Sequence, residues 1–213
     1  QIKLAAPTGK AAVRLTESIS GAISKLPQAM QHAIPTEVTT LHRLLGAVPN
    51  RRSFRHHADN PLQLDVLVVD EASMVDLEMM AALLTALPAQ AQLVLLGDKD
   101  QLSSVEAGSV LGDLCCGAET GGYHADTLAL LSPYSSVPLT AWQGEGTALN
   151  QATVMLRHSH RFSSSSGIGM LAAAVNRGET DAFALCDQFA DIDSVQAEDL
   201  SAIKAQVVAG FSH

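Results

Sequence analysis

The sequence predicts an α/β protein built around a parallel sheet. Two aliphatic runs, 66–69 and 93–96, have the composition of strands that are buried on both faces of a sheet. Between these runs, Ser73 and Asp76 offer a helix start and Pro88 a helix end. Helical spacing places the buried face of this helix at Leu77, Met80, Ala81, Leu84 and Leu87. A strand–helix–strand order predicts two parallel strands with a right-handed crossover.

The N-terminal third is predicted to continue this alternation. Residues 2–6 are expected to form a strand, 7–9 a turn and 10–26 a helix. Residues 39–46 form a second amphipathic segment that Gly46 and Pro49 end. The segment 49–61 is polar, basic and bounded by prolines, which indicates a loop or a small hairpin.

The C-terminal part is expected to contain a domain boundary near residue 150. From 117 to 150 the pattern dissolves into Gly, Ser, Thr and Pro, which predicts a long and flexible surface connection. Helical spacing returns around 168–175, and Gly178 ends it. We therefore expect a first domain over 1–150 and the beginning of a second over 151–213.

Polar residues follow both central strands directly. Asp70 and Glu71 end the first run, and Asp98 and Gln101 follow the second. Since parallel strands end at the same edge, these residues are expected to meet there. An aspartate can hold Mg²⁺ through water beside nucleotide phosphates, and a glutamate can polarise an attacking water. Taken alone, the acidic pair fits an ordinary surface turn equally well.

A Gly-Lys pair invites a phosphate-loop interpretation that the spacing excludes. A phosphate loop needs GxxxxGK followed by Ser or Thr. Here Leu4 stands five residues before Gly9, and Ala11 follows Lys10. The sequence thus has an acidic pair suited to nucleotide hydrolysis but no phosphate loop. We expect this combination in a piece of a longer protein that begins after that loop.

The charge is distributed unevenly. The chain carries −9 overall, yet residues 1–60 contain eight Lys and Arg against three acids. This asymmetry indicates that the N-terminal third faces a polyanion, with a solvated basic surface as the alternative. The basic residues are Lys3, Lys10, Arg14, Lys25, Arg43, Arg51, Arg52 and Arg55. Phe54 lies among the last three and could stack on a base, although an ordinary exposed loop is an equal alternative.

The cysteines and the absence of membrane or export signals predict an intracellular protein whose cysteines are reduced. The sequence contains no run of about 18 apolar residues, so it predicts no membrane span, and residues 1–6 are too short for a signal peptide. Cys115, Cys116 and Cys186 form no CxxC pair. The pairs His56–His57 and His158–His160 lack further ligands at metal spacing. Leu77, Met74, Met79 and Met80 are expected to belong to the core.

Five segments together resemble the superfamily-one DNA helicases: APTGKAAVRL, TTLHRLLG, VLVVDEASMVD, LVLLGDKDQLSSVEAGSVLGDL and SHRFSSSSGIGMLAAAVNRG. They occur in the family's order and cover about 1–117 and 150–180. The resemblance implies a RecA-like P-loop NTPase motor lobe, with the start of a second such lobe over 151–213. It implies ATP and Mg²⁺ as cofactors, single-stranded DNA as substrate, and 5′→3′ translocation. It also points to a subunit of a heterotrimeric repair complex with two partner subunits.

The resemblance also implies residue roles. Asp70 and Glu71 fall on the Walker-B pair, Gln101 on the γ-phosphate sensor, and Arg161 on the arginine that reaches the γ-phosphate from the second lobe. DNA contacts fall on Pro7, Thr8, Gly9, Lys10, Thr39, Thr40 and His42. The alternatives are a P-loop ATPase that does not act on DNA and a catalytically silent assembly module. The 213-residue chain alone is expected neither to bind Mg-ATP tightly nor to hydrolyse it.

Overall fold

The chain divides into two compact units, Gln1–Met155 and Leu156–His213, in a computed structural model. The structure describes residues 1–31, 34–49, 51, 53–99, 101, 110–157, 163, 165–194 and 200–210.

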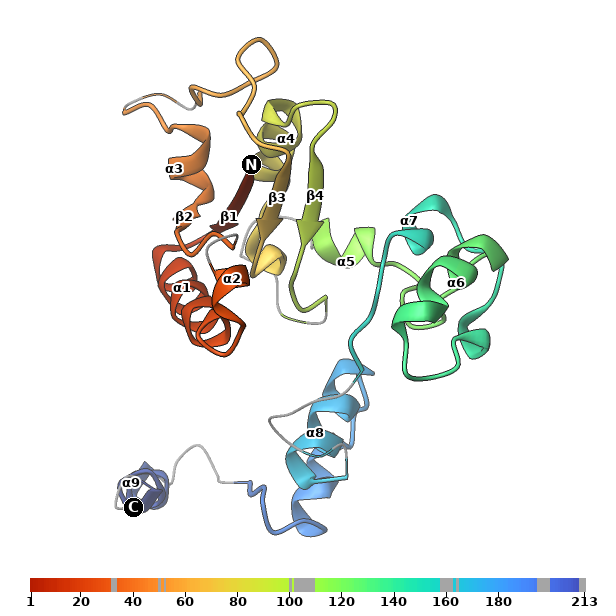
Figure 1. Cartoon of the computed structure of the whole chain (residues 1–213). Helices are drawn as coiled ribbons and strands as arrows, with labels where there is room; N and C mark the ends of the chain where they lie inside the picture. Colours follow the sequence, from red (N-terminus) through yellow and green to blue (C-terminus); the bar gives the residue numbers. More distant parts are fainter. Residues whose placement is uncertain are drawn as a thin grey trace. The chain divides into compact units, whose positions relative to one another are not determined.

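The first unit is built on a parallel sheet of four strands (Figure 1). The strands are β1 (Ile2–Ala6), β2 (Val38–Thr40), β3 (Val66–Val69) and β4 (Gln92–Leu95), and their order is β2-β1-β3-β4. Every neighbouring pair is parallel, with Leu4 opposite both Val38 and Val68. The predicted α/β class with a parallel sheet is therefore confirmed. The short strand β2 was not expected, because its three residues pair only with the distant β1.

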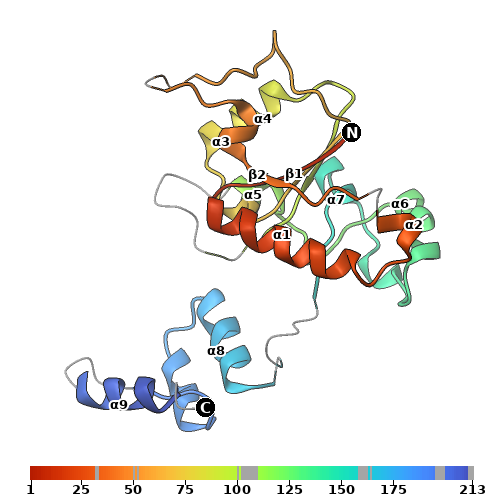
Figure 2. The same cartoon turned by 60° about the vertical axis from the view of Figure 1, so that its left-hand side comes forward.

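Helices cover the two faces of the sheet differently (Figure 2). On one face, Ala6 of β1 packs with Ala11 and Ala12 of α1 (Gly9–Ile23). On the other face, Ala5 belongs to the core under α3 (Leu41–Leu45) and α4 (Leu77–Ala86). Neighbouring residues of a strand point to opposite faces, which explains why two adjacent alanines serve two cores. A further short helix, α2, spans Gln28–Gln31.

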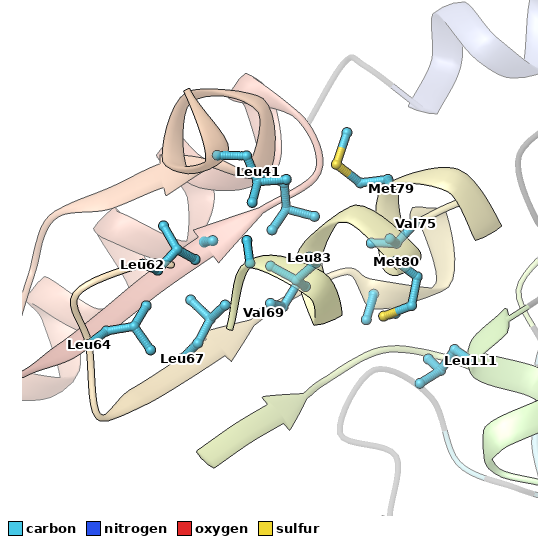
Figure 3. Close-up of a cluster of buried hydrophobic side chains, with 14 residues drawn as sticks. Leu41, Leu62, Leu64, Leu67, Val69, Val75, Met79, Met80, Leu83 and Leu111 are labelled. Carbon is cyan, nitrogen blue, oxygen red and sulfur yellow. The ribbon is translucent and has the colours of Figure 1, made fainter. Parts of the chain in front are cut away.

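The core that α3 and α4 form with the sheet, called the larger core from here on, is drawn in Figure 3. It shows that the buried face predicted for α4 was partly wrong. Its buried residues are Met79, Met80, Leu83 and Ala86. By contrast Leu77 and Leu84 are 64% and 55% exposed, and Met74 in the preceding turn is 41% exposed. Asp76 caps the helix by accepting a 2.7 Å hydrogen bond from the Met79 amide, as the helix start predicted. The helix is apolar on nearly all sides, so its sequence alone does not fix which face is buried.

Strand β4 differs from the expected fully buried strand. It forms an edge of the described sheet, and Val94 and Leu96 are 40% and 45% exposed. Leu93 and Leu95 point the other way and pack against the larger core. Among the described residues, the strand is thus covered on one face only.

Residues 110–155 contain regular structure, and they include the stretch 117–150 where we predicted a flexible connection. The elements are α5 (Val110–Leu114), α6 (Ala125–Leu131), η2 (Ser132–Tyr134), η3 (Thr140–Trp142) and α7 (Ala148–Gln151). The Gln151 side chain joins α7 to the start of α6 and to the loop before it. Its carbonyl accepts from the His124 amide and the Thr127 hydroxyl, both at 2.8 Å, and its amide donates to Gly122 O. The stretch 117–150 thus contains short helices in place of the expected irregular pattern, and its flexibility stays a prediction.

The second unit contains α8 (Gly167–Asn176), η4 (Ala182–Asp187) and α9 (Leu200–Gly210). The Asp191 carboxylate accepts hydrogen bonds from the amides of Gly167 and Ile168 at the start of α8. A negative charge is favourable at a helix N-terminus, so this contact closes the loop 177–191 onto the helix. Within the described part of the chain, none of the helices has the length and apolarity needed to cross a membrane.

Candidate functional site

The carboxyl edge of the sheet brings together the loops that follow β1, β3 and β4. The Asp70 amide donates to Ala5 O at 3.0 Å, which ties the end of β3 to β1. The Ala72 amide donates to Leu96 O and the Leu96 amide to Val69 O, both at 2.8 Å. These bonds hold Asp70 and Glu71 between the ends of the two neighbouring strands. The acidic pair thus lies at the carboxyl edge of the sheet, and the convergence with Asp98 stays a prediction.

Glu71 has an unusual backbone. Its φ is +52°, and among the described residues it is the only non-glycine with a positive φ. The left-handed conformation costs a non-glycine residue about 1–2 kcal/mol. Such strain is concentrated at functional sites, where the surrounding contacts impose it. Here the turn Ala72–Met74 (η1) follows directly, and the Met74 amide donates back to Glu71 O at 3.0 Å.

Two residues that the sequence analysis did not single out for this site connect the loops after β3 and β4. Ser73 is 3% exposed, and its hydroxyl donates to Gln101 Oε1 at 3.4 Å. Gly97 lies against the turn after β3, because a Cβ at this position would be 3.0 Å from Ser73 N and 3.1 Å from Ala72 N. A hydroxyl residue two positions after the acidic pair was the sequence signal for Ser73. Gly97 carried no such signal.

The predicted DNA-contacting residues lie at the ends of two adjacent strands. Thr8 caps α1 by accepting from the Ala11 amide, and Thr40 caps α3 by accepting from the Arg43 amide. Since Ala6 of β1 is opposite Thr40 of β2, the two caps belong to neighbouring loops of one edge. Lys10 and His42 are exposed beside them. Helix N-termini with hydroxyls and a nearby cation suit contacts with phosphate oxygens.

The basic segment 49–61 is attached to α3. The amides of Arg55 and His56 donate to the carbonyls of Gly46 and Leu45 at 2.9 and 3.0 Å, and Ala47 forms a bridge with Phe54. The Phe54 ring meets the His42 ring edge-on at a centroid distance of 6.0 Å. This part of the chain is a small hairpin-like turn, one of the two forms that the sequence predicted. Arg52 lies outside the described residues.

A concavity of about 650 Å³ lies elsewhere on the first unit. It is lined by the first residues of β1, by 34–37 and by Thr39, Arg43 and Leu44. Asp70, Glu71 and Gln101 do not contribute to it. The half-buried acidic pair therefore lies outside this concavity.

Lys99 connects the loop after β4 to the helical segment 110–155. Its Nζ forms a 2.9 Å ion pair with Glu119 Oε1. Burial raises the pKa of the nearby Cys115 thiol, and the positive charge of Lys99 opposes that rise. Cys115 packs against the larger core, which agrees with a structural cysteine.

Arg161, the predicted arginine of the second lobe, lies outside the described residues. So do His158, His160 and the segment 102–109. No group of three His, Cys, Asp or Glu side chains that could hold a metal ion occurs in the described part of the chain. The roles assigned to Asp70, Glu71, Gln101 and Arg161 stay predictions.

Comparison with known proteins identifies the class to which this fold and site belong. The AAA domain profile matches residues 1–107, which is half of the chain, and these residues hold the whole parallel sheet and the acidic pair. The chain therefore belongs to the AAA domain family, and its sheet is that of a RecA-like P-loop fold.

More specific relatives share longer stretches. The protein named RecBCD enzyme subunit RecD of Haemophilus influenzae is 43% identical over 190 residues, covering 84% of this chain and 29% of its own length. The protein of the same name from Mycolicibacterium smegmatis is 44% identical over 184 residues, which are 85% of this chain and 27% of that protein. The ATP-dependent RecD2 DNA helicase of Deinococcus radiodurans is 41% identical over 120 residues, covering 56% and 14%. The expected resemblance to DNA helicases is confirmed, and these relatives carry RecD names. The chain spans less than a third of the length of these relatives.

Proposed function

We propose that this chain is part of an ATP-driven motor that moves along single-stranded DNA, as the RecD-type α subunit of an exodeoxyribonuclease V complex. Its partners would be RecB and RecC, and its task would be recombinational repair of double-strand breaks in the bacterial cytoplasm. The observation that carries the proposal is the acidic pair Asp70–Glu71, fixed between β1 and β4 on the edge that also carries Thr8 and Thr40. The names of the relatives support the same reading.

The residues present fit a nucleotide with Mg²⁺. Mg²⁺ is usually held by one or two carboxylates together with phosphate oxygens and water, so the half-buried Asp70 would suit the role of holding it through water. The metal would neutralise charge on the β- and γ-phosphates. Glu71, held in its left-handed turn, would orient and deprotonate the attacking water. Gln101 would bind the γ-phosphate oxygens, and Arg161 would stabilise the charge that develops there.

The DNA track would cross the loops after β1 and β2. Pro7, Thr8 and Gly9 open α1, and Thr39 and Thr40 open α3. Their amides and hydroxyls would hold phosphates, while Lys10 and His42 are exposed for further contacts. Phosphate contacts of this kind release about 0.7 counterion each, so affinity for single strands should fall with salt.

Movement would come from a second lobe. We assign residues 151–213 to the beginning of a second RecA-like lobe, with the boundary near residue 150. In this proposal nucleotide binding draws the lobes together and hydrolysis releases them. Translocation would proceed 5′→3′, as the resemblance to this family implies.

The test is ATP turnover by the full-length protein that carries this segment, with and without single-stranded DNA. Glu71→Gln removes the proposed base, and Glu78→Gln is the matched control, because Glu78 is exposed on the first turn of α4. We expect DNA-stimulated turnover that Glu71→Gln abolishes and Glu78→Gln leaves unchanged. Turnover that does not respond to DNA would refute the DNA motor in favour of a general ATPase. No turnover even with RecB and RecC present would leave a silent assembly module.

A further inference from the structure

Ser73 is one of only two polar residues that are buried among the described residues, the other being Asn150. Asn150 has an evident structural task, since it completes the capping box of α7. Ser73 caps no helix. Its hydroxyl instead donates across 28 residues of sequence to the side chain of Gln101. A buried polar group normally needs a partner, and here that partner is the proposed phosphate sensor.

The backbone around Ser73 is held firmly. The preceding Ala72 donates to Leu96 O at 2.8 Å, and the Val75 amide donates back to Ala72 O at 3.1 Å. Gly97 lies so close that no side chain separates the two loops. Ser73 therefore presents its hydroxyl from a fixed position, two residues after Glu71.

Gln101 is different, because it is exposed and carries a long side chain. Such a side chain loses rotamer freedom when it is held for a ligand. Its backbone turns back by a 3.2 Å bond from its amide to Asp98 O. A hydrogen bond to the side chain of Gln101 would fix the orientation of its amide group before the nucleotide binds.

The chemistry of the amide group decides which end must be held. Phosphate oxygens only accept hydrogen bonds, so a glutamine that senses phosphate must present its NH₂ group to them. The carbonyl oxygen of the same amide then faces the protein and needs a donor. A serine hydroxyl supplies that donor, and the contact observed is the one between Ser73 Oγ and Gln101 Oε1.

We infer that Ser73 is a positioning residue that holds the Gln101 amide with its NH₂ group available to the γ-phosphate. It thereby links the phosphate sensor to the turn that carries Glu71. This inference rests on the proposed function, since it assigns a role within the same site. Ser73 itself contacts no reacting atom in this scheme.

The experiment is a double-mutant cycle in the full-length protein with RecB and RecC, measuring kcat and KM for ATP at saturating single-stranded DNA. The variants are Ser73→Ala, Gln101→Ala and both together. The control is Thr85→Ala, because the exposed Thr85 hydroxyl also donates a side-chain hydrogen bond, but to Ala81 O within α4. Loss of one hydrogen bond predicts about a three- to tenfold lower kcat for Ser73→Ala, with KM within about twofold. Thr85→Ala should leave both constants unchanged.

The interaction between the two sites is decisive. If Ser73 acts through Gln101, the double variant is no slower than Gln101→Ala alone. Effects that multiply would overturn the inference, as would an unchanged kcat in Ser73→Ala. Should the alanine variant fail to fold, Ser73→Cys keeps the volume and a weaker donor, and it should fall between wild type and Gln101→Ala.

Glu71→Gln separates this inference from the proposed function. If Glu71→Gln abolishes turnover but the effects of Ser73→Ala and Gln101→Ala multiply, only the role of Ser73 fails. If Glu71→Gln retains turnover, the proposed site itself fails.

Discussion

The replacement Gly97→Ala tests how closely the loops after β3 and β4 must approach. The added methyl group would lie 2.7 Å from Cδ2 of Leu111, 3.0 Å from Ser73 N and 3.1 Å from Ala72 N. Leu111 is 4% exposed, and Ala72 N is already bonded to Leu96 O, so neither neighbour moves freely. Overpacking of this kind costs about 1–3 kcal/mol of folding free energy. Because the strain falls on Ala72 and Ser73, we also expect lower ATP turnover in the full-length protein.

The assay is urea denaturation of the 213-residue chain, with unfolding monitored by far-UV circular dichroism and by the fluorescence of Trp142. A lower midpoint at an unchanged slope would report a loss of stability. The control is Gly21→Ala, since Gly21 lies within α1 and has no atom within 4 Å of the added carbon. That change should stabilise the helix by up to about 1 kcal/mol. A Gly97→Ala protein as stable as wild type, with full turnover, would refute the close approach.

Two further predictions concern the core and the cysteines. Leu83 is fully buried and Leu84 is 55% exposed, so Leu83→Ala should lower the free energy of unfolding by about 2–5 kcal/mol and Leu84→Ala by less than about 0.5. Equal effects in urea denaturation would contradict the observed face of α4. Burial raises the pKa of Cys115, whereas Cys116 is exposed, so Cys116 should react first with a thiol reagent at pH 7.5. Lys99→Met should slow the labelling of Cys115 further, because it removes the positive charge that lowers the pKa of this thiol; faster labelling would contradict this electrostatic effect.

Three of the four strands, β1, β3 and β4, could be predicted because their aliphatic composition differs sharply from their surroundings. The aliphatic run before Asp70 and the βαβ order fix the strand, its direction and the edge where the acidic pair lies. The buried face of α4 could not be predicted in the same way. Apolar residues occur on both sides of this helix, and only packing against Leu67 and Val69 selects Met80 and Leu83 over Leu77 and Leu84.

The segment 110–155 escaped prediction for another reason. Its order depends on polar contacts rather than on apolar periodicity. Gly121 and Gly122 take positive φ values of 76° and 72°, and the Gln151 side chain fastens residues 122, 124 and 127. An ordered polar network and an irregular loop can both be rich in Gly, Ser, Thr and Pro, so composition does not distinguish them. The link from Ser73 to Gln101 was hidden likewise, since it depends on the distance between two loops.

The one-sided cover of β4 has a consequence for handling the isolated chain. An edge strand offers unpaired amides and carbonyls, and here Val94 and Leu96 add exposed aliphatic surface beside them. Edges of this kind template pairing between separate molecules unless another segment covers them. The 213-residue chain expressed alone should therefore self-associate through this strand as its concentration rises. A lysine in place of Val94 should keep it monomeric, because charge on an edge strand opposes such pairing.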